Sequence, residues 1–309
     1  MKHFLIYTNP RKDKGMHVTK HVCQYLENHG QKCTIKSGNG EWTSSRNEIQ
    51  ADTSVPEDAS CMIVLGGDGT MLKAARELRG IPIPMTGVNL GTLGYMTEIE
   101  PANLEDALDR LIAGDYETES RMMLNGRAVF KSGGSEEGWA LNDIVISREG
   151  PLRVVKFNIF VNGQFLNDYN ADGIIITTPT GSTGYNLSAG GPIVEPGAKL
   201  IVVTPICAHT LSQRSIVLSP EDEIEIAIPL GREGQDQTAV ASFDGSHVVT
   251  LRTGEKIRIV KSDKTTEFIQ LNQVSFLEVM HKKMSVEADK GCRYEKEQTE
   301  NDSRIDWIK

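Results

Sequence analysis

The chain has 309 residues, a formal net charge of −9 at pH 7 and 39% hydrophobic residues. This length favours about two domains, each large enough to bury its own core, so the fold needs no disulfide or structural metal. The acidic balance disfavours non-specific binding to nucleic acid or to an anionic membrane.

Cysteine usage and hydropathy point to a soluble protein. The five cysteines show no CxxC spacing, which argues against both a disulfide framework and a zinc site. The apolar run at the start of the chain is too short for a signal peptide, and no run reaches the length that spans a bilayer. We therefore expect a cytoplasmic location, with no membrane or nucleic-acid partner.

The first hundred residues alternate strand patterns with helix patterns. Strands are expected at residues 4–8, 34–35, 61–65 and 83–88, and helices at about residues 18–26 and 70–79. Such alternation predicts a Rossmann-like α/β domain over residues 1–100, with a mostly parallel sheet whose ligands gather at the carboxyl ends of the strands. Residues 38–60 are rich in polar residues and glycine and are expected to form a long surface loop.

A glycine-rich loop, Gly66-Gly67-Asp68-Gly69-Thr70, lies between a strand and a helix of this domain. Glycines permit close approach to a ligand, and N–H groups at a helix start attract phosphate oxygens. Asp68 is unexpected here, because a carboxylate repels phosphates unless it binds a metal ion or accepts a proton from an attacking hydroxyl. The loop therefore favours phosphoryl chemistry, and a structural glycine turn capped by Asp68 is the alternative.

Two further segments follow strand ends in this half of the chain. Arg11 and Lys12 come just after the first strand, where two cations could face a phosphate, although exposed basic residues are usually solvated. The run from Asn89 to Tyr95 follows another strand, and its glycines are expected to shape the same crevice.

The pattern changes after a predicted helix at residues 101–114, which ends at Gly114. Period-2 alternation and hairpin turns such as Asn162-Gly163 predict a mainly β, sandwich-like domain over residues 101–272. Strands are expected at residues 153–161, 223–228, 238–243 and 256–260. A short helix over residues 273–285, which could return to the first domain, and a polar, disordered tail over residues 286–309 complete the prediction.

The β region carries two candidate ligand segments. Asn142 and Asp143 precede an apolar strand and could share the hydroxyls of one ribose; a turn or strand-end cap is the alternative. Residues 172–188 run from a buried strand into glycines and hydroxyl side chains that can bind phosphate, ribose or adenine, with Tyr185 as a flat surface for a base. A turn that satisfies its own backbone is the alternative here. Asp244, at another strand end, is best explained as a hairpin aspartate.

Together these segments resemble the NAD kinase family. The resemblance rests on the glycine-rich loop, on Asn142-Asp143 and on residues 172–188, which occur in the family's order, and it extends from about residue 4 to residue 280. The Gly-Gly-Asp-Gly element alone also occurs in diacylglycerol and sphingosine kinases, whereas the other two segments are similar to NAD kinases in particular. Gly184 is a departure, because the usual family form has alanine there.

The resemblance implies transfer of the γ-phosphoryl group of ATP, or of polyphosphate, to the 2′-hydroxyl of the adenosine ribose of NAD, giving NADP. It also implies that Asp68 is the catalytic base, that Asn142 and Asp143 hold a ribose, and that Asp172 binds near the nicotinamide end. The residues that would surround the adenine and its ribose are Thr183, Gly184, Tyr185, Asn186, Leu187 and Ser188. Further dinucleotide contacts would be Gly69, Lys73 and Arg153, and the phosphate-binding loop comprises Gly66, Gly67, Gly69 and Thr70.

Mg²⁺ is the implied cofactor, because the chain has no GxxxxGK[ST] motif and phosphoryl transfer depends on charge neutralisation. The ion is expected on phosphates and water rather than on direct protein ligands. NAD and ATP are the implied small-molecule partners at a domain junction, and family members suggest a homo-oligomer, either a dimer or a tetramer. Two alternatives stay open: a lipid or polyol kinase of the related fold, and a non-catalytic dinucleotide sensor.

Overall fold

The computed structural model describes residues 1–37, 42–44, 55–78, 80–91, 94–150, 154–210, 214–271 and 275–285. The chain divides into two units, Met1–Leu271 and Asn272–Lys309. The larger unit contains all the sheets described below, and the smaller one contains a helix over residues 276–285.

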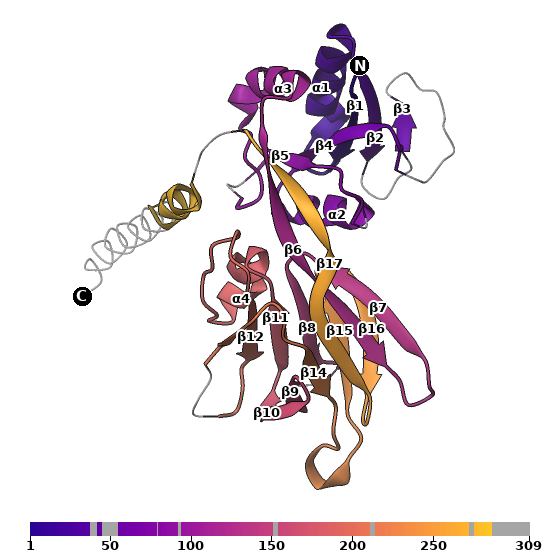
Figure 1. Ribbon diagram of the computed structural model, residues 1–309, viewed down its shortest axis with the longest axis vertical. Coiled ribbons are helices and arrows are strands. Elements are labelled where there is room, and N and C mark those ends of the chain that lie inside the picture. Colours follow the sequence, from indigo (N-terminus) through magenta and orange to yellow (C-terminus); the bar gives the residue numbers. More distant parts are fainter. Residues whose placement is uncertain are drawn as a thin grey trace, which may run out of the picture. The chain divides into compact units, whose positions relative to one another are not determined.

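The N-terminal half of the larger unit is a parallel sheet with helices on both faces (Figure 1). Its parallel strands, in spatial order, are β5 (Met85–Asn89), β4 (Ala59–Gly66), β1 (His3–Thr8) and β2 (Lys32–Ser37), with β3 (Trp42–Ser44) antiparallel at the edge. The helical segments are η1 (Lys14–Met16), α1 (His17–Asn28), α2 (Asp68–Leu78), η2 (Pro101–Asn103) and α3 (Leu104–Ala113). The predicted α/β architecture is therefore confirmed, and the predicted helix at 101–114 is seen as η2 and α3.

Alternation along β1 explains why helices cover both faces of this sheet. Phe4 and Ile6 pack into the core on the side of α1 and α3, whereas Leu5 and Tyr7 pack into the core on the side of α2. Because both faces are buried, the strand is almost continuously apolar, as in other parallel sheets. The carboxyl ends of β1, β4 and β5 then lie at one edge, where the loops that follow them meet.

The second half consists of antiparallel strands in two layers. One layer contains β6 (Glu117–Val129), β7 (Ser135–Ala140), β9 (Val155–Val161), β10 (Gln164–Ala171), β14 (Ile224–Ala227) and β17 (Lys256–Gln270). The other has the order β13 (Ile216–Leu218), β12 (Ile201–Ile206), β11 (Gly173–Thr177), β8 (Asp143–Arg148), β15 (Thr238–Phe243), β16 (His247–Arg252). Three short helical segments, η3 (Thr180–Thr183), α4 (Tyr185–Ser188) and η4 (Arg232–Gly234), lie in the connections.

The core between the two layers confirms the predicted sandwich-like arrangement. Ile174 and Ile176 of β11 face Phe157, Ile159 and other apolar side chains of the opposite layer. The predicted hairpin turn between β9 and β10 is also confirmed, since Asn162 and Gly163 have φ values of 51° and 76°.

β6 and β17 are long strands that join the two halves into one sheet. They pair antiparallel from Lys256↔Val129 to Gln270↔Glu117, and Phe268 of β17 pairs with Met85 of β5. Figure 1 shows both strands running from the helix-covered half into the β half. Sequence patterns predicted only residues 256–260 of β17 and missed β6, so the continuity of the sheet was not expected.

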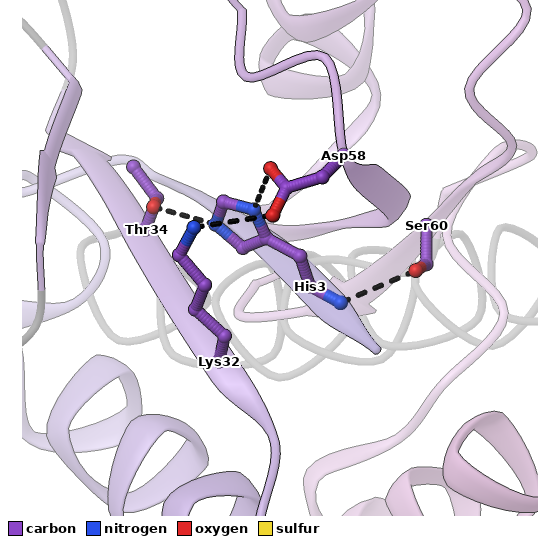
Figure 2. A network of polar contacts seen from close by, with 5 residues as sticks. All are labelled: His3, Lys32, Thr34, Asp58 and Ser60. Carbon is purple, nitrogen blue, oxygen red and sulfur yellow. Dashed lines mark hydrogen bonds and ion pairs between the residues drawn. The ribbon is translucent and has the colours of Figure 1, made fainter. Parts of the chain in front are cut away.

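A polar network fixes the start of β1 between its two neighbours (Figure 2). The ring of His3, which is 3% exposed, contacts Asp58 at 2.6 Å and Thr34 at 2.7 Å, and Lys32 reaches the same carboxylate at 3.1 Å. The hydrogen bond with His3 lowers the pKa of Asp58. This network lies at the amino ends of the strands, which leaves the opposite edge to the ligand loops.

The helix over residues 276–285 confirms the predicted C-terminal helix. Ser275 precedes it, and its hydroxyl accepts a hydrogen bond from the backbone N–H of Glu278 at 3.2 Å, as an N-cap does. The predicted tail at 286–309 and most of the predicted loop at 38–60 lie outside the described residues, although β3 falls within that loop. None of the described helices is long and apolar enough to cross a membrane.

Candidate active site

The glycine-rich loop joins the carboxyl end of β4 to the first turn of α2. The backbone N–H groups of Thr70 and Met71 donate to the carbonyl of Gly67 at 2.7 and 3.0 Å. The N–H groups of Asp68 and Gly69 have no such bond within the described part of the chain. Two donors at a helix N-terminus are thus available to an anion.

A side chain at Gly66 would collide with Thr70, and the end of the Lys12 side chain reaches the loop at Gly67. A Cβ added at Gly66 would lie 2.3 Å from Oγ1 of Thr70, and one added at Gly67 would lie 2.8 Å from Nζ of Lys12. Asn9 donates its side-chain amide to the same Thr70 hydroxyl at 3.2 Å. The segment after β1 therefore packs directly against the loop.

Lys12 brings a positive charge to the glycine loop. A Cβ added at Gly91 would lie 2.9 Å from the Lys12 ammonium, so this group sits between the carboxyl ends of β4 and β5. None of the carboxylates in the described residues forms an ion pair with Lys12. The sequence predicts only that Lys12 is one of two cations after the first strand. The structure shows that its ammonium lies at the glycine loop.

Asp68 is oriented by a second loop. Its carboxylate accepts hydrogen bonds from the backbone N–H groups of Tyr95 at 2.8 Å and Met96 at 3.1 Å. A Cβ at Gly94 would lie only 2.1 Å from an Asp68 oxygen, so that loop needs glycine to approach. The donors of these bonds lie outside α2. The Asp68 carboxylate therefore does not cap its own helix, which was the alternative interpretation. Each carboxylate oxygen still has a lone pair for a further donor.

Asn142 and Asp143 lie where β7 passes into β8, and Asp244 holds them there. The Asp244 carboxylate accepts three consecutive backbone N–H groups, from Leu141 at 2.8 Å, Asn142 at 2.9 Å and Asp143 at 3.1 Å. Asp244 and Gly245 form the turn between β15 and β16, with φ values of 47° and 66°. Asp244 is a hairpin aspartate, as expected, but its side chain also positions the candidate ribose-binding pair.

Burial sets the protonation of this carboxylate pair. Burial, followed by the charge of Asp244, raises the pKa of Asp143 to about 7. Burial also raises the pKa of Asp244, although its three backbone donors act in the opposite direction. Near neutral pH, Asp143 therefore exchanges between a hydrogen-bond donor and an acceptor.

The hydroxyl-rich loop after β11 packs against the same pair. The Thr178 hydroxyl donates a hydrogen bond to the backbone carbonyl of Leu141 at 2.6 Å. The Thr178 backbone N–H donates to the backbone carbonyl of Asn142 at 2.9 Å. A Cβ at Gly181 would lie 2.4 Å from the Asn142 carbonyl oxygen. Oδ1 of Asn142 and Oγ1 of Thr180 are buried and bond to none of the described residues, so they are candidates for ligand contacts.

The six predicted adenine-binding residues divide into three groups, of which Thr183 and Gly184 form the half-buried one. Tyr185, Leu187 and Ser188 are exposed, and Tyr185 is 48% exposed, so their side chains are accessible to a ligand. The Asn186 side chain is buried and instead bonds to the carbonyls of Ser182 and Pro192 at 3.1 and 3.0 Å. The side-chain oxygen of Asn186 accepts a hydrogen bond from the hydroxyl of Thr204 in β12. Asn186 therefore organises the loop.

Within this chain Asp172 lies away from Asn142 and Asp143. It precedes β11, whose pairing with β8 runs from Gly173↔Ser147 to Thr177↔Asp143. The length of five strand residues, about 17 Å, therefore separates it from Asp143. Its carboxylate accepts from Arg148 at 3.0 Å.

Two predicted dinucleotide contacts, Lys73 and Arg153, are still to be placed. Lys73 is exposed on α2, one turn after Gly69. Arg153 lies outside the described residues. Among the described residues, no cluster of three or more His, Cys, Asp or Glu side chains could hold a metal ion.

Two protein-family models match the chain. Residues 4–116 match the model of the ATP-NAD kinase N-terminal domain, and residues 141–271 match that of the ATP-NAD kinase C-terminal domain. The chain is 46% identical to an NAD kinase of Agathobacter rectalis over 92% of this chain and 99% of the relative. It is 42% identical to an NAD kinase of Lachnospira eligens, over 92% and 100% of the two chains.

Two solved structures share the fold. An NAD kinase from Archaeoglobus fulgidus in complex with ATP has a TM-score of 0.71 and 26% identity, covering 91% of this chain and 98% of the other. The yeast NADH kinase complexed with NADH has a TM-score of 0.75 at 23% identity, covering 91% and 86% of the two chains.

Proposed function

This chain belongs to the NAD kinase family and is a phosphotransferase, and we propose that it transfers the γ-phosphoryl group of ATP to the 2′-hydroxyl of the adenosine ribose of NAD. In this step the oxygen of the 2′-hydroxyl forms a bond to the γ-phosphorus as the bond to the β-phosphate oxygen breaks. The hydroxyl proton passes to Asp68, and ADP leaves with the electron pair of the broken bond. The products are NADP and ADP.

The arrangement around Asp68 is the observation that carries this proposal. Two backbone N–H donors of α2 and the ammonium of Lys12 provide positive charge for the donor phosphates. The Tyr95 and Met96 N–H groups fix the Asp68 carboxylate, which keeps lone pairs free to accept the hydroxyl proton. An anion cradle with an oriented base inside it suits phosphoryl transfer to an alcohol better than it suits simple phosphate binding.

We assign the acceptor site to the segments that meet at Asn142. Asn142 and Asp143 bind ribose hydroxyls, and Tyr185 offers its exposed ring to the adenine. The other adenosine contacts come from Thr183, Gly184, Leu187 and Ser188, while Asn186 supports their loop. Lys73 and Arg153 are further dinucleotide contacts that rest on the family resemblance.

Mg²⁺ fits this site as an ion carried by the donor phosphates. Asp68 accepts two backbone N–H groups, and Asp172 pairs with Arg148, so neither carboxylate is arranged as a dedicated metal ligand. When bound, Mg²⁺ would neutralise phosphate charge and orient the γ-phosphate. Chelation with EDTA is expected to abolish activity, and added Mg²⁺ to restore it.

We infer that the active protein is a cytoplasmic homo-oligomer. The separation of about 17 Å along β11 bears on the homo-oligomer, because Asp172 cannot contact the ribose that Asn142 of its own chain holds. A neighbouring copy could supply Asp172 to that site. The oligomer would then be required for a complete dinucleotide site.

The test is NADP formation by the purified protein from NAD, ATP and Mg²⁺. Replacing Asp68 by Asn should lower kcat by about 10²- to 10⁴-fold, the usual contribution of a general base, while NAD binding persists. Tight NAD binding by the unmutated protein without NADP formation would instead favour a dinucleotide sensor. Phosphorylation of a lipid or polyol in place of NAD would contradict the assignment of the acceptor.

A further inference from the structure

A cavity of about 450 Å³ lies beside the C-terminal half of α2. Its walls come from α2, β6, β7, the β15–β16 hairpin and β17, so both halves of the sheet contribute to it. This volume falls in the range of small-molecule sites. None of the candidate residues predicted from the sequence lines it.

The cavity has unpaired positive charge. Arg76 and Lys264 line it, and neither forms an ion pair within the described part of the chain. Its three carboxylates are already engaged. Glu77 pairs with Lys36 at 2.8 Å, Glu137 lies 3.6 Å from Arg127, and Asp244 accepts three backbone N–H groups. Lys264, and Arg76 whose charge also acts on Asp244, are therefore the lining cations available to an anionic ligand.

An aromatic face lies next to these cations. Trp139 of β7 is 38% exposed, and Nζ of Lys264 lies 4.2 Å from the centre of its ring. Leu141 and Met123 add apolar surface to the same cavity. A flat indole beside a cation suits a planar base attached to phosphates, because the base stacks and the charge meets the phosphate.

The cavity is aligned with the catalytic aspartate along α2. Asp68, Leu72 and Arg76 are spaced by four residues, which places them on one face of the helix. Eight residues of helix separate Asp68 from Arg76 by about 12 Å. A ligand whose base lies at Trp139 could therefore extend its phosphates along this face towards the N-terminus of α2.

We propose that this cavity binds the nucleoside of the phosphoryl donor. In this assignment Trp139 stacks on the base, Arg76 and Lys264 contact the phosphates nearest to the nucleoside, and the terminal phosphate reaches the glycine loop. The assignment rests on the proposed function, since it concerns the donor of that same reaction. It also implies that the donor is a nucleoside triphosphate rather than polyphosphate.

Kinetics of Trp139→Ala test the base contact. We expect KM for ATP to rise about tenfold or more, in line with the loss of a base–aromatic stack, while kcat and KM for NAD change little. Tripolyphosphate, used as donor or as competitive inhibitor, should bind the variant and the unmutated protein equally. Trp139→Phe should restore most of the affinity for ATP, and Phe165→Ala, which removes another exposed aromatic side chain, is the matched control.

Kinetics of Lys264→Ala test the phosphate contact. This change should weaken both ATP and tripolyphosphate, with partial recovery in Lys264→Arg. Lys261→Ala is the control, because Lys261 lies on the same strand but pairs with Glu221. Photolabelling of the unmutated protein by 8-azido-ATP provides a measurement that needs no variant, and the label is expected on the peptide that contains Trp139.

Three outcomes would overturn the assignment: an unchanged KM for ATP in Trp139→Ala, an equal loss of ATP and tripolyphosphate binding in that variant, or labelling confined to other peptides. The proposed function fails separately, if the unmutated protein makes no NADP at all. The two failures are therefore distinguishable.

Discussion

At the scale of single residues, Asp244 and Asp143 link the geometry of the site to its protonation. Asp244 satisfies three backbone donors that would otherwise be buried without partners, and unpaired buried N–H groups cost about 1–3 kcal/mol each. Burial, followed by the Asp244 carboxylate that this placement brings close, raises the pKa of Asp143. The contacts that position the ribose-binding pair therefore also place the Asp143 carboxylate where the Asp244 carboxylate repels it.

Removal of the Asp244 carboxylate should mainly weaken NAD binding. We expect Asp244→Ala to raise KM for NAD by about tenfold and to lower the melting temperature, because the Leu141–Asp143 backbone loses its three hydrogen bonds. Asp222→Ala is the control, since Asp222 also accepts a backbone N–H in a turn, but on the surface. Equal effects of the two changes on KM for NAD would refute a positioning role for Asp244.

The raised pKa of Asp143 predicts a pH dependence of stability. An ordinary aspartate in the unfolded chain has a pKa of about 3.9. Since the folded value is about 7, the folded protein keeps a proton that the unfolded chain releases, and the contribution of this group to stability falls as pH rises between these values. It is fully present below about pH 4 and lost above about pH 7.

Asp143→Asn should remove this decline. Relative to the unmutated protein, the variant should gain about 1–3 kcal/mol in the free energy of unfolding between pH 5 and pH 8, measured by urea denaturation. Asp236→Asn, at an exposed position, should show no such gain. A pH dependence in Asp143→Asn identical to that of the unmutated protein would contradict the assignment.

Sequence patterns could identify Asn142 and Asp143, because a polar pair directly precedes an apolar strand. They could not identify the clamp, since Asp244 lies 101 to 103 residues from the groups it binds. The same reason applies to Lys12, whose position at the glycine loop depends on the neighbouring carboxyl ends of β1, β4 and β5. Local residue chemistry was predictable, and long-range contacts were not.

At the scale of elements, the loop after β5 controls the orientation of the base at the start of α2. Gly94 allows the Tyr95 and Met96 N–H groups to reach Asp68, and a side chain at this position would lie 2.1 Å from the carboxylate. The catalytic geometry therefore depends on two loops that follow adjacent parallel strands.

Gly94→Ala should displace the Asp68 carboxylate and lower kcat by about tenfold or more, because misplacement of a reacting group by 1 Å is costly. NAD affinity should change little. Gly134→Ala is the matched control, since a Cβ there would meet its nearest atom at an ordinary 3.7 Å. Unimpaired kcat in Gly94→Ala would show that this loop does not orient Asp68.

Helices and strands that bury the same face along their whole length could be predicted from the periodicity of their apolar residues. β15 (Thr238–Phe243) and the helix that ends at Gly114 match their predicted positions, because each buries one face along its whole length. β6 and β17 pass from one half of the sheet into the other, and their register shifts between Lys261 and Thr265. Their pattern of buried residues therefore changes along the strand, which hid both the length of β17 and the existence of β6.

At the scale of the whole molecule, the separation of Asp172 from Asn142 predicts sites shared between copies. If a neighbouring chain supplies Asp172, mixed oligomers of Asp68→Asn and Asp172→Ala chains will contain some intact sites. Random mixing should restore about a quarter of the activity. A site is intact only if its own chain has Asp68 and the neighbouring chain has Asp172, and each condition is met in about half of the sites.

The two chains, co-expressed in equal amounts and purified through one tag common to both, provide this measurement. Asp68→Asn mixed with Asn142→Ala is the control, since both residues lie in one chain's site and no mixture restores them together. Recovery in the control mixture, or none in the test mixture, would mean that Asp172 does not act across a subunit contact.

β17 also has a consequence for the order in which the protein is completed during synthesis. It is the last strand of the larger unit in chain order, yet it lies between β14 and β5 and pairs with β6 along its length. A nascent chain that ends before residue 256 lacks the strand that pairs with β6 and β14 in the β half and reaches β5 of the α/β half at Phe268. Neither half is a finished folding unit until about residue 270 has left the ribosome, so cleavage or stalling upstream should yield no independently folded fragment.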